Sequence, residues 1–82
     1  MSVRVNLYFE RPKYKSISIY KMDLPSSKSI AELKSLIVHK IKNSPSEQRW
    51  YYNGHVLSDS STLENVAANG IILVKICDSD SG

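Results

Sequence analysis

One stretch of this 82-residue chain, residues 44–66 ("SPSEQRWYYNGHVLSDSSTLENV"), gathers the side chains that could do chemistry. It holds the only tryptophan, Trp50, two tyrosines, His55 and several hydroxyl groups. Such a set could form a hydrolytic site around a serine nucleophile, or a surface that stacks nucleic-acid bases. It could also occupy ordinary structural positions, and the rest of the chain has to distinguish these cases.

The serine, histidine and aspartate residues do not form a recognisable catalytic arrangement. We expect His39 on a helix face away from the core and His55 directly after a turn, so nothing brings either to a nucleophile in a cleft. Residues 58–61 (Ser-Asp-Ser-Ser) are typical of turns and helix caps. A small core built on one main helix also leaves little room for a water-excluding pocket. We therefore expect no catalytic residue and no enzymatic activity.

Metal and cofactor binding are equally unsupported by the spacing of the residues. One cysteine and two distant histidines do not provide the ligand spacing of a zinc site. The glycines stand at positions 54, 70 and 82, too far apart for a phosphate-binding loop. We expect no metal, no cofactor and no small-molecule substrate.

Length and composition are those of one small globular domain. Hydrophobic residues make up 41% of the chain and charged residues 23%. A domain of this size buries roughly 60–65% of its unfolded surface, so its core is modest. The chain has no apolar run of the ~20 residues needed to span a membrane, and its N-terminus lacks signal-peptide features. Because Cys77 cannot form an internal disulfide, we expect a reducing intracellular compartment, the cytoplasm or the nucleus.

The positive charge is concentrated in the first part of the chain. Residues 1–50 carry ten Lys or Arg and four Asp or Glu (+6), whereas residues 51–82 carry one Lys and four acids (−3). This asymmetry could be a solvated basic face, a docking surface for an acidic protein, or a nucleic-acid-binding surface. The basic residues are scattered along the segment, which argues against a nucleic-acid footprint.

Two strands are predicted at the N-terminus. Apolar residues alternate with polar ones at Val3, Val5, Leu7 and Phe9, which predicts a strand with one buried face. Pro12, in the charged segment 10–15, predicts a hairpin loop. Residues 16–20 (Ser-Ile-Ser-Ile-Tyr) alternate again, and the short connection favours antiparallel pairing.

A helix of about three turns is predicted after Pro25. Ser29 with Glu32 three residues later forms a capping-box pattern. The apolar stripe of this helix consists of Ile30, Leu33, Ile37 and Ile41. Lys40 and Lys42 suit its C-terminus, and residues 43–45 (Asn-Ser-Pro) end it.

The second half of the chain contains short strands and turns. Residues 49–52 (Arg-Trp-Tyr-Tyr) predict a strand, Asn53-Gly54 a tight hairpin turn, and residues 55–57 a short return strand. Residues 58–66 predict a loop and one helical turn containing Leu63 and Val66, with Asp59, Ser60 or Ser61 as caps. After the turn at residues 69–70, residues 71–76 predict a last strand. Its inward residues are Ile72, Val74 and Ile76, and its outward residues are Ile71, Leu73 and Lys75.

This order of elements resembles the ubiquitin-like family from residue 3 to residue 76. Residues 25–37 ("PSSKSIAELKSLI") are similar to the family's entry into its helix, and Pro45, Gln48 and Arg49 match its Pro-x-x-Gln-Arg segment. Residues 52–54 match its aromatic-x-Gly turn. The family's Leu-x-Asp…Thr-Leu pattern is matched by Leu57, Asp59, Thr62 and Leu63. The resemblance implies an α+β, ubiquitin-like β-grasp fold, in which a mixed four- to five-stranded sheet packs on one main helix plus a short helical turn. The domain would span residues 1–77, with residues 78–82 as a polar tail or the start of a linker.

The resemblance also implies a protein-binding site on the exposed sheet face. Strand alternation places Tyr51 on the face opposite to Trp50 and Tyr52. In the resemblance Trp50 and Tyr52 pack inward, and Tyr51 takes the central position of the family's recognition patch. We expect the patch to consist of Tyr51, Leu73 and Lys75, with Arg49 and His55 at its rim. Ubiquitin's own patch is small and aliphatic, so this aromatic patch with a lysine favours a dedicated partner.

The last residues of the sequence help to distinguish a conjugatable modifier from a non-conjugatable domain. Residues 77–82 ("CDSDSG") contain one terminal glycine and acids, whereas ubiquitin-like modifiers end in Gly-Gly. We therefore expect a non-conjugatable domain, monomeric, like those at the N-terminus of proteasome shuttles, endoplasmic-reticulum degradation factors, chaperone cofactors and ubiquitin ligases. Its partner would be a proteasome subunit, a ubiquitin-binding domain or a dedicated receptor. The alternatives are a free ubiquitin-like protein acting non-covalently, as one splicing-associated member does, a modifier processed from a longer precursor, or a basic nucleic-acid-binding domain.

Overall fold

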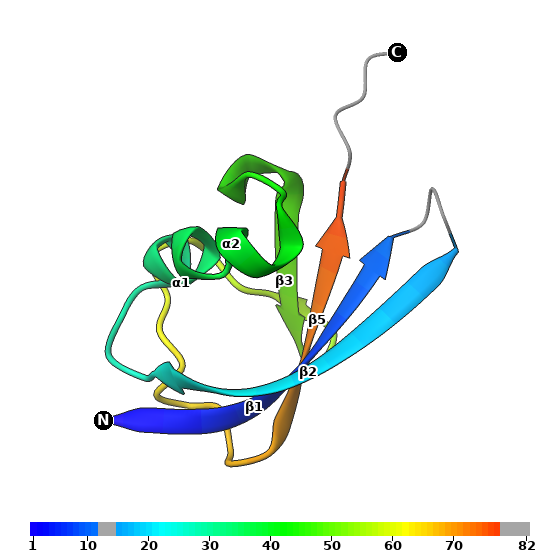
Figure 1. Cartoon of the computed structure of the whole chain (residues 1–82). Helices are drawn as coiled ribbons and strands as arrows, with labels where there is room; N and C mark the ends of the chain where they lie inside the picture. Colours follow the sequence, from blue (N-terminus) through cyan, green and yellow to red (C-terminus); the bar gives the residue numbers. More distant parts are fainter. Residues whose placement is uncertain (12–14, 78–82) are drawn as a thin grey trace.

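Strands and short helices alternate along the part of the chain that the computed structural model describes, residues 1–11 and 15–77 (Figure 1). The strands are β1 (Ser2–Arg11), β2 (Ser16–Pro25), β3 (Gln48–Tyr52), β4 (His55–Val56) and β5 (Gly70–Ile76). The helices are α1 (Ile30–Leu36), α2 (Val38–Ile41) and the 3-10 turn η2 (Pro45–Glu47). The loop predicted around Pro12 and the tail predicted at 78–82 lie outside the described residues.

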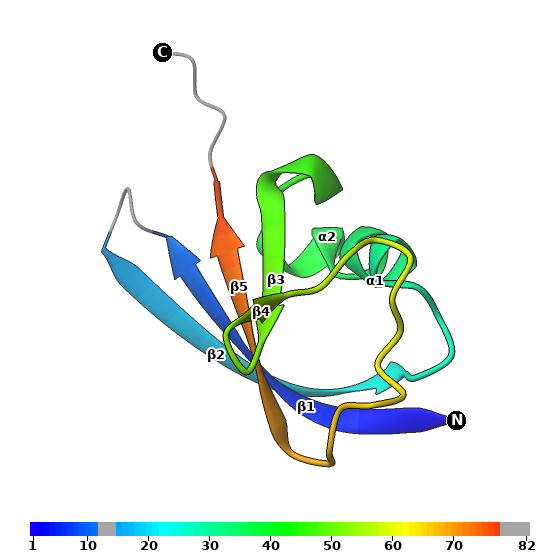
Figure 2. The ribbon, with the colours of Figure 1, turned by 180° about the vertical axis from the view of Figure 1, so that it is seen from behind.

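The strands form one mixed sheet in the order β2-β1-β5-β3-β4. β1 pairs antiparallel with β2 and parallel with β5, and β3 pairs antiparallel with both β5 and β4. β2 and β4 are therefore the two edges of the sheet, and the view from behind shows β4 next to the end of β3 (Figure 2). The expected α+β arrangement with a mixed sheet is confirmed.

β1 and β2 are longer than the alternation predicted. Glu10 and Arg11, expected in the loop, pair with Ile17 and Ser16 and belong to the ladder. β2 continues past Tyr20 to Pro25, because Met22 and Leu24 keep pointing inward against β1. The long hairpin gives the sheet a two-stranded arm that carries much of its outer surface.

The core lies between the sheet and the two helices, which cover one face of the sheet (Figures 1 and 2). Every residue of the predicted helical stripe is buried. From the sheet, the core contains Val5, Leu7, Phe9, Leu24, Trp50, Ile72, Val74 and Ile76. Each inward prediction for β3 and β5 is confirmed, with Tyr52 half-buried against the same cluster.

The predicted three-turn helix is divided into two pieces at Ile37. Its backbone there has φ −93° and ψ 0°, outside the helical range, and α2 begins at the next residue. Ile37 and Val38 are consecutive β-branched residues, which disfavour helix propagation. The break keeps both Ile37 and Ile41 buried, so the stripe is preserved although the helix is not continuous.

The predicted capping box at the start of α1 is formed. The Ser29 hydroxyl accepts a hydrogen bond from the Glu32 amide at 3.3 Å, and the Ser29 amide donates to Glu32 Oε1 at 3.1 Å. The pKa of Glu32 is held below its ordinary value by hydrogen bonds to its carboxylate, first from the Ser29 amide and then from the Ser29 hydroxyl at 3.2 Å, and by the nearby positive charge of Lys28.

Replacing Ser29 with alanine should destabilise the domain by about 1 kcal/mol, because the Glu32 amide at the start of α1 loses the side-chain oxygen that accepts its hydrogen bond. Urea denaturation followed by circular dichroism measures this loss. Ser27→Ala, an exposed serine in the preceding turn, serves as the control and should leave the unfolding midpoint unchanged. Equal midpoints for Ser29→Ala and the parent domain would contradict the capping contribution.

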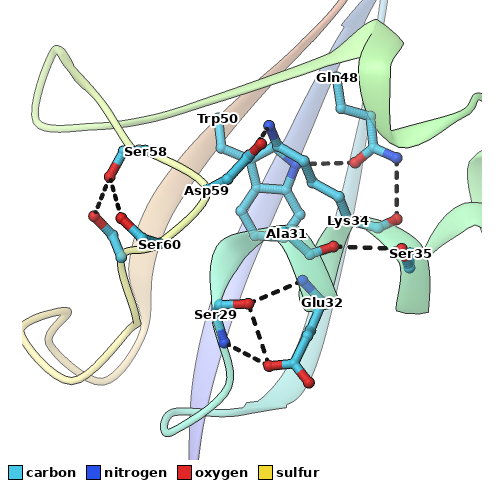
Figure 3. A network of polar contacts seen from close by, with 11 residues as sticks. Ser29, Ala31, Glu32, Lys34, Ser35, Gln48, Trp50, Ser58, Asp59 and Ser60 are labelled. Carbon is cyan, nitrogen blue, oxygen red and sulfur yellow. Dashed lines mark hydrogen bonds and ion pairs between the residues drawn. The ribbon is translucent and has the colours of Figure 1, made fainter.

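The segment between β4 and β5 differs from the prediction in its caps. Leu63 and Val66 are buried and enclose one turn, closed by a hydrogen bond from the Val66 amide to the Leu63 carbonyl at 3.0 Å. The cap is the Thr62 hydroxyl, which accepts from the Glu64 amide at 3.4 Å, and not Asp59, Ser60 or Ser61. Asp59 instead accepts from Lys34 Nζ at 2.8 Å and ties this loop to α1 (Figure 3).

Candidate functional site

The sheet face that points away from the helices, here called the outer face, carries the predicted site. Tyr51 lies opposite Leu73 in the β3–β5 ladder, and Arg49 lies opposite Lys75. Because directly opposed residues share a sheet face, these four side chains are brought together as predicted. Tyr51 and Leu73 are half-buried, whereas Arg49 and Lys75 are exposed.

A shallow groove of about 480 Å³ runs over this part of the outer face. Its lining consists of Tyr51, Asn53, Gly54, Ile71, Leu73 and Lys75. The tight turn at its end has φ 52° at Asn53 and φ 80° at Gly54, the left-handed backbone that an Asn-Gly turn provides. The turn thereby folds β4 back beside β3, and its two residues line part of the groove.

The charged residues of the site are held close to its aromatic ring. Lys75 Nζ lies 5.6 Å from the centre of the Tyr51 ring, within the range of a cation–π contact. Arg49 Nε donates to Cys77 Sγ at 3.3 Å. This hydrogen bond raises the pKa of Arg49, whose guanidinium is positively charged. The site is therefore an apolar strip with cationic side chains on one side.

His55 is separated from the other predicted residues. It pairs with Tyr52, which points inward, so strand alternation turns His55 away from Tyr51. It is exposed, and it is absent from the lining of the groove. The outer-face residue of β4 is its neighbour Val56, which pairs with Tyr51.

The sequence prediction missed the part of the outer face formed by β1 and β2. Tyr8 pairs with both Ile19 and Leu73, so the three share this face. Ile19 and Ile17 are exposed, although they alternate with serines as core-facing residues would. The alternation of isoleucines with serines was the signal in the sequence that could have revealed this surface. The unexpected feature is that the serines, and not the isoleucines, lie on the sheet face that the helices cover.

On the inward side of β3, Trp50 and Gln48 form hydrogen bonds that reach the helical segment (Figure 3). Trp50 Nε1 donates to Gln48 Oε1 at 2.9 Å, and Gln48 Nε2 donates to the carbonyls of Lys34 and Asn43 at 3.1 and 3.2 Å. Trp50 is fully buried and Gln48 nearly so. This network joins β3, the strand that displays Tyr51, to α1 and to the segment after α2.

No other chemical centre emerges from the described ranges, 1–11 and 15–77. They contain no group of three His, Cys, Asp or Glu side chains that could hold a metal ion. His39 and Cys77 are exposed, at separate places on the surface. Within the same ranges, no helix has the length and apolar character needed to cross a membrane.

The architecture defines a β-grasp domain that displays an apolar strip on its outer face. The sequence model of the ubiquitin family matches residues 13–75, and the chain belongs to this family. A protein described as "UV excision repair protein RAD23 homolog" from Dictyostelium discoideum is 38% identical over 60 residues. These residues cover 71% of this chain and 18% of that relative, so the chain spans a small part of the relative's length.

Proposed function

We propose that this ubiquitin-family domain is a non-enzymatic protein-interaction module that binds its partner through the outer face. The observation that carries the proposal is the pairing of Tyr51 with Leu73 beside a groove that nothing in the described residues fills. Apolar side chains grouped on a surface favour association, and tyrosine and arginine are frequent anchors of interfaces. Arg49 and Lys75 add attraction for a partner with acidic groups.

We further propose that the module works within a larger protein of the ubiquitin–proteasome or protein quality-control system. The relative described as a UV excision repair protein is much longer than the region that matches this chain. This supports the proposal that the module is part of a larger protein. The partner would be a proteasome subunit, a ubiquitin-binding domain or a dedicated receptor, in the cytoplasm or nucleus. Within this proposal His55 has a peripheral place, since the register turns it away from Tyr51.

Replacing Tyr51 with alanine should weaken binding to purified proteasomes at least about tenfold, the effect of losing a central aromatic anchor. The affinity is measured with the domain immobilised on a surface and the proteasomes in solution. Circular dichroism should show a folded variant, because Tyr51 lies outside the core.

Leu36→Gln is the matched control, because Leu36 is 50% exposed on α1, away from the outer face. It should bind as the parent domain does. If the Tyr51 variant binds as tightly as the parent, the outer face is not the docking surface. Binding that falls steeply with salt and persists in the Tyr51 variant would instead favour the basic face as the contact.

A further inference from the structure

β2 forms one edge of the sheet, and its outer side is open. Among the described strands it pairs with β1 alone, and Figures 1 and 2 show no strand beyond it. The pairing runs through the whole of β2, Ser16–Pro25, in one register without a bulge. Edge strands of this kind present a row of backbone amides and carbonyls that can pair with another chain. β2 therefore offers a template for one more strand.

The ladder with β1 determines which backbone groups of β2 point outward. The Ser26 amide donates to the Met1 carbonyl at 2.8 Å, so these two residues form a hydrogen-bonded pair in line with the ladder. Hydrogen-bonded and non-hydrogen-bonded pairs alternate along antiparallel strands. The Arg4 carbonyl fits this alternation, since it turns away from β2 and accepts from the Asn69 amide at 2.7 Å. The residues of β2 whose amides and carbonyls face the open side are therefore Ile17, Ile19, Lys21 and Asp23.

These outward groups are self-complementary in one antiparallel arrangement. With a twofold axis at Tyr20, Ile19 lies opposite Lys21 of the second copy, and Ile17 lies opposite Asp23. The outward residues all have odd numbers, so they meet one another in hydrogen-bonded pairs. Every outward amide and carbonyl of residues 17–23 then gains a partner, which removes the exposed edge.

The neighbouring registers are less favourable. An axis at Lys21 sets the two lysines directly opposite each other, and it brings Pro25, which has no amide hydrogen, into a hydrogen-bonding position. An axis at Ile19 requires Lys15 as the partner of Asp23, and the φ of 49° at Lys15 is not extended backbone. The remaining axis avoids both conflicts and keeps the whole pairing within β2.

The side chains of β2 also suit burial by a second copy. Its large exposed apolar side chains are Ile17, Ile19 and Tyr20, at 62%, 54% and 37%. Tyr20 would stand at the axis in a non-hydrogen-bonded pair, where opposing side chains come closest. Its ring contacts Phe9 edge-on, with 5.3 Å between the ring centres, and its free side would meet the same ring of the second copy. Pairing would therefore cover apolar surface on both faces of the strand.

Charge and area limit how tightly two copies associate. Lys40 Nζ lies 5.7 Å from the centre of the Tyr20 ring, so the axis brings two such ammonium groups near each other. Lys21 has the same effect on the outer face, because lysine on an edge strand weakens pairing. A paired edge over residues 16–24 is about 30 Å long and about 10 Å thick, which gives about 300 Å² per copy. This is below the ~800 Å² of a standard interface, so we expect a dissociation constant on the order of 0.1–1 mM.

We infer that two copies of this domain associate by antiparallel pairing of their β2 strands about a twofold axis at Tyr20, which joins their sheets into one. The inference goes beyond the proposed function. Directly opposed residues share a sheet face, so the outer faces of both copies would lie on the same side. At strand spacings of about 4.8 Å, the two Tyr51 positions would stand about 34 Å apart. With the proposed function, the dimer presents two binding sites, which raises the avidity for a repeated partner.

Sedimentation equilibrium of the whole chain between about 0.05 and 2 mM tests self-association. The weight-average mass should rise toward that of a dimer across this range. Raising the salt from about 50 to 500 mM should tighten the dimer severalfold, because it screens the lysines at the axis. In NMR spectra, the amide signals of β2 should shift with concentration and those of β4 should not. A mass that stays monomeric up to about 2 mM overturns the inference.

Ile19→Pro tests the backbone pairing. The Ile19 amide points away from β1, so proline removes an intermolecular donor and leaves the β1–β2 ladder in place. It should weaken the dimer at least about tenfold, whereas Ile19→Val, which keeps the amide, should change it less than about threefold. Circular dichroism checks that both variants are folded. Equal dimer constants for the two variants would show that edge pairing is not the contact.

A single cysteine reports the position of the axis. In a Cys77→Ser background, Tyr20→Cys places two thiols opposite each other, with Cα atoms about 4.5–5.5 Å apart, within the range of a disulfide. Ser18→Cys is the matched control on the same face, because the twofold separates its two copies by about 14 Å. In a mild thiol–disulfide buffer, Tyr20→Cys should form a covalent dimer at least about tenfold faster than Ser18→Cys. Equal rates, or a faster link from Ile19→Cys or Lys21→Cys, overturn the axis at Tyr20.

The dimer and the proposed function fail separately. Tyr51→Ala should leave the dimer constant unchanged, since β1 and β5 separate β3 from β2. A monomeric domain that still binds proteasomes through Tyr51 would overturn the dimer and keep the proposed function. Amide shifts of β2 that arise only when proteasomes are added would mean that the edge pairs with a foreign strand, and they would likewise overturn self-pairing.

Discussion

Replacing Trp50 with alanine should destabilise the domain by about 3–5 kcal/mol, the loss seen when a large aromatic side chain leaves a cavity in a core. Trp50 has no exposed surface and is the largest of the fully buried side chains. The change would also leave Gln48 Oε1 without the indole donor that it now accepts from at 2.9 Å. A domain of this length has a total stability of about 4–12 kcal/mol, so the change removes a large share of the free energy of unfolding and should lower the urea midpoint strongly.

Far-UV circular dichroism during urea denaturation is the appropriate measurement, because the change removes the only tryptophan fluorophore. Trp50→Phe keeps most of the volume and should cost clearly less than the alanine variant. Tyr51→Ala changes the next residue of the same strand but faces the opposite side, so it should cost less than about 1 kcal/mol. Similar losses for Trp50→Ala and Tyr51→Ala would mean that β3 does not separate a core side from a binding side.

The features that the sequence predicted correctly depend on neighbours close in the chain. The capping box of Ser29 and Glu32 spans three residues, and the Asn53-Gly54 turn requires only its own backbone conformation. The alternation of β5 likewise needed no knowledge of its partners. Combined with the family resemblance, these local signals were sufficient to place Tyr51 and Leu73 on one exposed face.

The features that it missed depend on contacts between distant segments. Tyr8 joins Ile19 to Leu73 only because β1 pairs with β2 on one side and with β5 on the other. No local pattern states that β5 lies parallel to β1. The alternation of β2 could not tell which of its faces meets the helices, so the exposure of Ile19 required the register.

In the proposed function, one short strand combines stability, through Trp50, with recognition, through Tyr51. Their side chains point to opposite faces, so the core contact of Trp50 fixes the backbone that displays Tyr51. A site held in this way loses little conformational entropy when a partner binds. Mutations on the outer face should therefore affect affinity with little effect on folding, and mutations beneath it should do the reverse.

Replacing Gln48 with leucine is the second change with a large expected effect, about 2–4 kcal/mol of stability. Leucine has nearly the volume of glutamine, so the loss comes from hydrogen bonds and not from a cavity. Trp50 Nε1 and the carbonyls of Lys34 and Asn43 would each lose a partner in a region where Gln48 itself is 2% exposed. Thermal unfolding of the variant should show a midpoint lower by about 10 °C or more.

A double-mutant cycle between Gln48→Leu and Trp50→Phe isolates the hydrogen bond that joins these two side chains. For this hydrogen bond, each single change leaves the other side chain without its partner, whereas the double variant removes the donor and the acceptor together. The loss in the double variant should therefore be smaller than the sum of the single losses, by about 1 kcal/mol or more. Strict additivity would show that the Trp50–Gln48 contact contributes nothing to stability. Gln48 would then act only by holding the carbonyls of Lys34 and Asn43, joining the helical segment to the strand that carries the site.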